Sequence, residues 1–170
     1  MDLRLAHLEW ILKKEGLKPA VKYLNSRVPY RFTTVYRLEH DVFNVIETVD
    51  KLDEFNPNAS SSTPYSQSLC RFPVLHGTFS TSDTATDPRL KGLCYPSAVG
   101  SYSGVQLTLA NGDLYGTFCH YDFAKQVISH FEYQFLQLAT TLITRHLQEN
   151  ASTYRVAYHH WSEQSSGPVR

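Results

Sequence analysis

The clearest pattern of apolar and polar positions in the chain lies between Ala98 and Asp122. Two runs of β-forming residues, Val99–Leu109 and Leu114–Tyr121, flank an Asn111-Gly112 pair. Asn-Gly tolerates the positive φ of a tight turn and is a strong short-range signal for a β-hairpin. Side chains alternate between the two faces of a strand. In the second run, one face carries Leu114, Gly116, Phe118 and His120, and the other carries Tyr115, Thr117, Cys119 and Tyr121.

Apolar residues at helical spacing predict two helices near the N-terminus. Asp2 is a suitable cap for the first helix, which ends at Gly16. Pro19 suits the first turn of the second helix, which stops at Val28-Pro29. The apolar positions of the two helices are Leu5, Leu8, Ile11 and Leu12, then Ala20, Val21 and Leu24.

The longest helical pattern follows the hairpin and predicts a helix over Phe123–Leu147. Its apolar stripe consists of Val127, Ile128, Phe131, Phe135, Leu138 and Leu142. Covering the sheet is the simpler explanation of such a stripe, and a self-complementary dimer surface formed with the first helix is a second use. Beyond Asn150, Tyr154–Tyr158 suits a terminal strand and Ser165–Arg170 a frayed end.

Shorter patterns fill the middle of the chain. Runs rich in β-forming residues predict strands over Arg31–Leu38, Val42–Val49 and Thr78–Thr81, the first two joined by a turn at Glu39-His40-Asp41. The polar segment Asp50–Ser66 contains two prolines and predicts a loop. A short helix is expected within Gln67–Leu75, and a loop with one helical turn over Asp83–Tyr95.

The length and composition of the chain indicate a single domain with a substantial hydrophobic core. The 170 residues are 42% hydrophobic and 13% aromatic, which is enough apolar material to bury. Sixteen basic residues balance 16 acidic ones, so the chain has no overall field that favours nucleic acid or an anionic membrane. Eight of the basic residues lie in the first 40 positions, scattered as on solvated helix faces. We therefore expect neither a nucleic-acid nor a membrane partner.

The cysteines bear on location and on metal chemistry. Cys70, Cys94 and Cys119 are odd in number and lack close spacing, which suits a reducing compartment. The start of the chain shows no secretory signal pattern, and no window approaches the ~20 apolar residues of a membrane span. We expect a cytoplasmic protein. Zinc requires clustered thiolate and imidazole ligands, so no metal site is expected. A serine hydrolase is also not indicated, because Tyr102 stands where the nucleophile of a Gly-x-Ser-x-Gly turn would be.

The hairpin resembles the closing hairpin of the GAF domain, a small-molecule sensor module. The resemblance rests on Ser101–Leu107 and Gly112–Cys119 with the following Asp122, and upstream on Ser68-Leu69-Cys70, Ser82-Asp83-Thr84 and Asp87–Leu90. It covers roughly residues 20–150, which leaves 1–19 as an N-terminal helical extension and 151–170 as a C-terminal tail. It implies an α+β fold, GAF-like and related to profilin and PAS. In that fold a central antiparallel β-sheet has terminal helices on one face and pocket-forming loops on the other.

The same resemblance implies which residues line the pocket. In the GAF register they are Tyr36, Phe79, Asp83, Tyr95, Tyr102, Gln106, Phe118 and His120. A structural interpretation stands beside the functional one, because aromatic residues are ordinary core residues more often than ligand contacts. Asp83 also suits the cap of a turn, and His120 suits a hydrogen-bonded core histidine. No bilin is expected, since the Asp-Ile-Pro signature of phytochrome-type GAF domains is not recognisable.

The resemblance favours a sensory or regulatory module. It would bind a small molecule non-covalently and signal through a homodimer or a partner protein. One alternative is a thiol-based redox enzyme or sensor, because one GAF branch, the free-methionine-sulfoxide reductases, uses cysteines on the pocket loop. Cys94 would then be the reactive thiol and Cys70 its resolving partner, whereas Cys119 fits a buried inert thiol. The other alternative is a ligand-free dimerisation module, whose dimer would fail when Leu8 or Leu138 becomes Asp.

Overall fold

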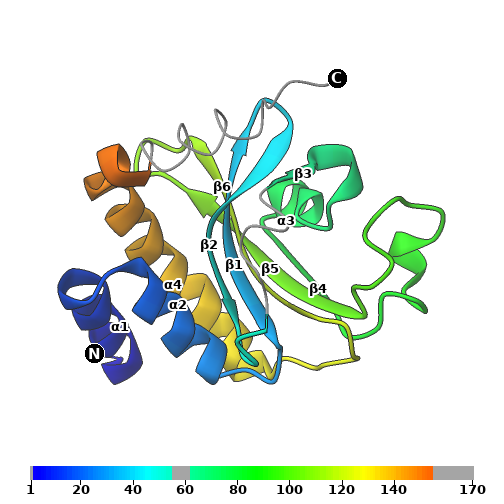
Figure 1. Ribbon diagram of the computed structural model, residues 1–170, viewed down its shortest axis with the longest axis horizontal. Coiled ribbons are helices and arrows are strands. Elements are labelled where there is room, and N and C mark those ends of the chain that lie inside the picture. Colours follow the sequence, from blue (N-terminus) through cyan, green and yellow to red (C-terminus); the bar gives the residue numbers. More distant parts are fainter. Residues whose placement is uncertain (1, 55–61, 155–170) are drawn as a thin grey trace.

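A single antiparallel sheet organises the molecule. The computed structural model describes residues 2–54 and 62–154. Six strands are ordered β3-β2-β1-β6-β5-β4, and every neighbouring pair is antiparallel. The helices α1, α2 and α4 cover one face, whereas α3 and the loops around it cover the other (Figure 1). This is the α+β arrangement predicted from the sequence.

The first hairpin joins β1 (Phe32–Glu39) to β2 (Val42–Asp50) through two residues. His40 and Asp41 have φ values of 51° and 59°, so both are left-handed. A two-residue turn of this kind matches the right-handed twist of the strands that it joins. The turn predicted at this place is confirmed.

The second hairpin joins β5 (Ser101–Thr108) to β6 (Leu114–Asp122). Its connection is longer than the two-residue turn that Asn111-Gly112 predicts. Gly112 has a φ of 89°, and among the described residues of this connection it alone has a positive φ. The Leu109 N–H donates to the carbonyl of Asp113, which closes the loop. The hairpin itself is confirmed.

The sheet edges are short. Strand β4 (Thr78–Thr81) pairs with β5 as expected. Strand β3 (Ser62–Pro64) pairs with β2 inside the segment that was predicted to be loop, which is a correction. Proline is tolerated there because an edge strand leaves one row of N–H groups unpaired. Between these edges lie η2 (Tyr65–Gln67) and α3 (Arg71–His76), and η3 (Pro88–Leu90) follows β4.

The main core lies between the sheet and the helices. Helices α1 (Leu3–Lys14) and α2 (Leu17–Ser26) meet at Gly16, and α4 is His130–Glu149. Helices α2 and α4 lie against the sheet, and α1 packs against both of them. Leu8 of α1, Phe118 of β6 and Ile143 of α4 are completely buried in one cluster.

Helix α4 differs from its prediction at both its start and its buried face. It begins seven residues later than Phe123, because the Ser129 side chain accepts a hydrogen bond from the Glu132 N–H and caps the helix there. Its fully buried apolar residues are Phe135, Leu136, Ala139, Ile143 and Leu147. Phe131 and Leu138 of the predicted stripe are exposed, as is Val127 before the helix. Along most of the helix, the buried residues therefore lie about one position after those of the predicted stripe.

The predictions for the C-terminal tail can be compared with the structure only in part. Residues 151–154 are helical, so Tyr154 is not the start of a strand, and the rest of Tyr154–Tyr158 lies outside the described residues together with Ser165–Arg170. No helix in the described part of the chain is long and apolar enough to cross a membrane.

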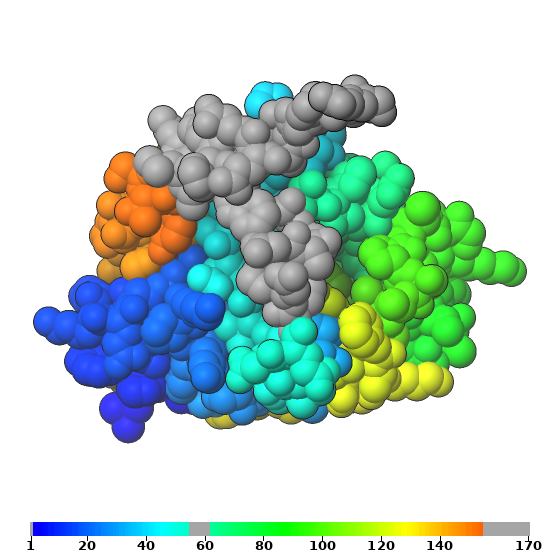
Figure 2. All heavy atoms as spheres, viewed as in Figure 1, coloured from blue at the N-terminus to red at the C-terminus, as the bar shows by residue number. Residues whose placement is uncertain are grey.

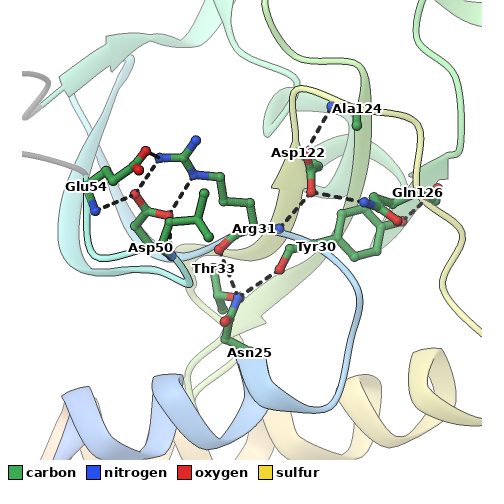
Figure 3. A network of polar contacts seen from close by, with 10 residues as sticks. Asn25, Tyr30, Arg31, Thr33, Asp50, Glu54, Asp122, Ala124 and Gln126 are labelled. Carbon is green, nitrogen blue, oxygen red and sulfur yellow. Dashed lines mark hydrogen bonds and ion pairs between the residues drawn. The ribbon is translucent and has the colours of Figure 1, made fainter.

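A polar network fixes the end of the sheet where β1 begins (Figure 3). Asp122, at the end of β6, accepts hydrogen bonds from the backbone N–H groups of Arg31 and Ala124, each at 2.9 Å, and from Gln126. The Arg31 guanidinium pairs in a bidentate way with Asp50 at the end of β2, both contacts at 2.8 Å. The ends of three strands are thereby tied together by two carboxylates. Asp122, part of the motif on which the GAF resemblance rests, has a structural use here.

Replacing Asp122 with Ala is expected to lower the free energy of unfolding by about 2 kcal/mol, because two backbone N–H groups lose their hydrogen bonds to a buried carboxylate. Chemical denaturation at neutral pH measures this change. Asp113→Ala is the matched control, since Asp113 is exposed in the β5–β6 loop, and is expected to stay within about 0.5 kcal/mol of the wild type. Equal stabilities of the two variants would contradict the assigned role of Asp122.

Candidate functional site

A cavity of about 240 Å³ lies on the sheet face opposite α1, α2 and α4. Its floor consists of side chains from β1, β2, β5 and β6, and its walls come from residues 63–70 and 96–99. In the space-filling view, the blue N-terminal helices form one side of the molecule and the green segment that follows β3 forms the other (Figure 2). The cavity therefore belongs to the loop-covered side, as the GAF register implied.

The lining of the cavity is apolar and hydroxyl-bearing. Thr34 Oγ1 of β1 and Thr48 Oγ1 of β2 are hydrogen-bonded at 2.8 Å. Tyr36, Tyr102 and Tyr121 contribute aromatic rings with neutral hydroxyl groups, because burial raises the pKa of each phenol. No carboxylate, ammonium or guanidinium belongs to the described lining. The cavity offers hydrogen bonds and ring contacts but no counter-ion.

Two thiols also line the cavity, one from each side. Cys70 belongs to the segment that leads into α3, and Cys119 belongs to β6. The Tyr102 hydroxyl donates to Cys70 Sγ at 3.3 Å, and Ser68 Oγ accepts from the Cys70 N–H at 3.1 Å. Both thiols are buried, as the sequence predicted for Cys119. The described residues contain no group of three or more His, Cys, Asp or Glu side chains that could hold a metal ion.

Of the eight residues that the GAF register implied, Tyr36 and Tyr102 line this cavity. Phe79 is buried close by and stacks on Phe72 with ring centroids 4.5 Å apart, but it is a core residue rather than a lining residue. Gln106 is half-buried near the other end of β5 and is not part of the lining.

The loop after β4 holds the next two predicted residues away from the cavity. Asp83 pairs with Lys125 at 2.6 Å and accepts from Thr86, so it acts as a turn residue. The Tyr95 hydroxyl donates to the carbonyl of Thr84 at 3.1 Å, and its ring borders a wider hollow of about 660 Å³ within residues 84–97. Cys94 is exposed in the same loop and is not part of the cavity lining.

Phe118 and His120 require a correction, because they point away from the cavity. Both belong to the helix-covered face of β6, where Phe118 is part of the main core. Their neighbours Cys119 and Tyr121 point into the cavity. Alternation along the strand did separate these two sets in the sequence, but the set assigned to the pocket was the wrong one. Cys119 and Tyr121 are thus the residues that the same signal would have found.

His120 is held as a neutral side chain between β1 and α2. Thr33 Oγ1 accepts a hydrogen bond from Asn25 Nδ2 at 2.8 Å and shares a second hydrogen bond with His120 Nδ1, 2.7 Å away. The imidazole also stacks on the Tyr30 ring. Burial, with a smaller contribution from Lys51, lowers the pKa of His120 to about 3. His120 is a core histidine and not a ligand contact.

Comparison with known proteins adds information on the fold only. No protein-family model and no curated protein matches the sequence. Among solved structures, the chain is similar to the GAF domain from Acinetobacter phosphoenolpyruvate-protein phosphotransferase, with a TM-score of 0.70 and 13% identity over 88% of this chain and 93% of that one.

Two further structures are similar in the same way. The type II free methionine-R-sulfoxide reductase from Thermoplasma acidophilum has a TM-score of 0.62 and 18% identity, over 84% of this chain and 96% of that one. The chromophore-binding domain of an unusual bacteriophytochrome from R. palustris has a TM-score of 0.66 and 13% identity, over 88% of this chain and 62% of that one. At these sequence identities the similarity concerns the backbone fold. The chemistry of the cavity has to be inferred from the residues that line it in this chain.

Proposed function

We propose that this chain, whose fold is that of a GAF domain, is a regulatory module that binds a small neutral ring compound non-covalently. The observation that carries the proposal is the cavity between the sheet and residues 63–99, which is lined by tyrosines and threonines without a charged side chain. Small-molecule sites are built in this way, from apolar and aromatic walls with a few directed polar groups.

The lining restricts the chemistry of the ligand. A carboxylate or phosphate would lose its hydration without meeting a cation, which is costly in a buried site. A hydroxyl or carbonyl group on the ligand can instead bond to the Thr34–Thr48 pair or to Tyr121, while a ring packs against Tyr36. A neutral compound with one or two hydrogen-bonding groups therefore fits best.

The volume restricts the size of the ligand. A cavity of ~150 Å³ accommodates benzene. The cavity of about 240 Å³ thus has room for about ten non-hydrogen atoms, which corresponds to a single ring with short substituents. Substituted phenols and phenyl ketones are members of this class and serve as probes.

Native mass spectrometry of freshly purified, fully reduced protein tests the proposal. We expect an added mass that is lost on denaturation. In parallel, a neutral phenol at 100 times its Kd is expected to stabilise the protein by about 2.7 kcal/mol, or roughly 5–10 °C in Tm.

The matched variants are Ala98→Trp and Ala110→Trp. Ala98 is an exposed residue that lines the cavity, so an indole there fills the entrance, whereas Ala110 is exposed in the β5–β6 loop away from it. Loss of binding in Ala98→Trp alone supports the proposal. Absence of a bound mass together with no Tm shift for any neutral ring compound would favour the ligand-free module instead.

We propose that α1 and α4 carry the output of binding. Their outer surface bears exposed apolar side chains, namely Leu3, Trp10, Phe131 and Leu138. Grouped exposed apolar side chains mark interaction surfaces more often than isolated ones do. A second copy of this chain or a partner protein would cover them, and ligand binding would shift the population of the associated state.

A further inference from the structure

The two cavity thiols form a cluster with two hydroxyl groups that the proposed ligand site does not require. We call Cys70, Tyr102, Thr117 and Cys119 the dithiol cluster. Cys119 and Thr117 lie on the same face of β6, and Cys70 faces them from the segment before α3. Both side chains belong to one buried cluster and line the same cavity. Two cysteines far apart in the sequence thus meet in a buried site.

The Tyr102 hydroxyl of the cluster is aimed at Cys70. The Tyr102 ring lies over Gly104, where a Cβ atom would come within 2.3 Å of the Tyr102 oxygen. Glycine at this position therefore allows the ring to lie along β5 and its hydroxyl to reach Cys70 Sγ at 3.3 Å. Thr117 Oγ1 is buried and has no hydrogen-bond partner among the described residues.

This arrangement treats the two thiols differently. Burial opposes ionisation of Cys70, but the polar groups around it, among them the Tyr102 hydroxyl, outweigh burial and lower the pKa of this thiol. Burial raises the pKa of the Cys119 thiol, and its hydrogen bond to Cys70 keeps it protonated. Because the Tyr102 hydroxyl donates a hydrogen bond to Cys70 Sγ, Cys70 is the cysteine whose thiolate form this site stabilises, and Cys119 is the thiol that lines the cavity with it.

We propose that Cys70 and Cys119 are a redox-active pair that a hydroperoxide converts reversibly into a disulfide. The Cys70 thiolate attacks the terminal peroxide oxygen, the O–O bond breaks, and water or an alcohol leaves after protonation, with Cys70 as a sulfenic acid. Cys119 sulfur then attacks the Cys70 sulfur, the S–S bond forms, and water leaves with the Cys119 proton. The two thiols give up two electrons, which the peroxide accepts.

The product would change the cavity. A disulfide requires the two sulfur atoms to approach to about 2 Å, which pulls the start of α3 towards β6. Both cysteines line the cavity, so the disulfide narrows the space between Leu69 and Tyr102. Oxidation would thus act on the same wall that the ligand uses. The pair differs from the Cys94–Cys70 couple implied by the methionine-sulfoxide reductases, since Cys94 is exposed and outside the cavity lining.

The experiment uses the Cys94→Ser protein, which removes the exposed thiol. It is reduced, treated with hydrogen peroxide, alkylated under denaturing conditions and digested for mass spectrometry. We expect the loss of two hydrogens from the intact mass and a cross-linked peptide that joins Cys70 to Cys119, both reversed by dithiothreitol. Recovery of both cysteines as alkylated thiols would overturn the proposal, as would oxidation of Cys119 before Cys70.

Single replacements in the same background separate the two roles. With Cys119→Ser, Cys70 is expected to accumulate as a sulfenic acid that dimedone traps. With Cys70→Ser, Cys119 is expected to remain a thiol. Dimedone labelling of Cys119 in the second variant would contradict the assignment of Cys70 as the nucleophile.

Tyr102→Phe tests the hydrogen bond without removing the ring. The titratable groups that face Cys70 are Cys119, Tyr36, Tyr102 and Tyr121, and none of them is a charged side chain. Loss of the Tyr102 hydrogen bond is expected to raise the midpoint of the pH profile for reaction with peroxide by about one unit, which slows the reaction about tenfold below that midpoint. Gly104→Ala, which displaces the Tyr102 hydroxyl, should shift the profile in the same direction. An unchanged midpoint in both variants would contradict this role.

Discussion

Replacement of Leu8 by Asp is expected to unfold the protein. Leu8 is 0% exposed and lies in the main core with Ile11, Phe135 and Ala139. Loss of a buried leucine costs about 2–5 kcal/mol, and the carboxylate would also lose its hydration without a partner. The total is comparable to the ~5–15 kcal/mol that stabilises a domain. Circular dichroism and the soluble yield of the purified variant measure the outcome.

Leu138→Asp is the matched control for Leu8→Asp, because it makes the same substitution on a side chain that is 55% exposed. We expect it to fold with a free energy of unfolding within about 1 kcal/mol of the wild type. If the outer face of α1 and α4 carries a homodimer, this variant is monomeric by analytical ultracentrifugation. The sequence alone proposed both residues for a dimer test, whereas only Leu138 is placed to serve in one. A well-folded Leu8→Asp protein would contradict the described core.

The second large effect is a loss of stability in mild acid that originates at His120. Its pKa is about 3 in the folded protein, below the ordinary value of 6.5. As the pH falls below 6.5, His120 therefore binds a proton in the unfolded chain but not in the folded protein. The contribution of neutral His120 to the free energy of unfolding is fully present above pH 6.5. Between pH 6.5 and 5 we expect the free energy of unfolding to fall by about 2 kcal/mol from His120 alone.

Carboxylates contribute at lower pH, which keeps the two effects apart. The Arg31 side chain lowers the pKa of Asp50 to about 2, so this ion pair is lost only as the pH falls from about 5 towards 2. Urea unfolding at pH 7, 6 and 5 thus reports the histidine window. His120→Asn removes the titrating group and retains a polar side chain near Thr33, and its stability is expected to depend less steeply on pH.

His40→Asn is the control for this measurement. His40 is exposed in the β1–β2 turn with a φ of 51°, a conformation that asparagine tolerates well. We expect the pH dependence of His40→Asn to follow that of the wild type. If His120→Asn and His40→Asn show the same dependence on pH, His120 is not the acid-sensitive group.

Local signals were sufficient for most elements of the fold, although not for the short edge strand β3. The alternation of side chains predicted the β5–β6 hairpin, and the spacing of apolar residues predicted α1 and α2, because both periods arise from backbone geometry within one segment. The cap at Ser129 is a local signal too. It was overridden in the prediction by the apolar residues of 127–128, which lie outside the helix.

The sequence by itself thus determined an antiparallel α+β domain and divided β6 into two faces. It did not determine which face the helices cover, because both faces carry buried residues, such as Phe118 on one and Cys119 on the other. Only the packing of α2 and α4 against Phe118 makes the opposite face the cavity. Only the tertiary structure brings Cys70 to the same cavity as Cys119. Proximity between segments that are distant in the sequence produces no periodic pattern in either segment, so the sequence could not predict it.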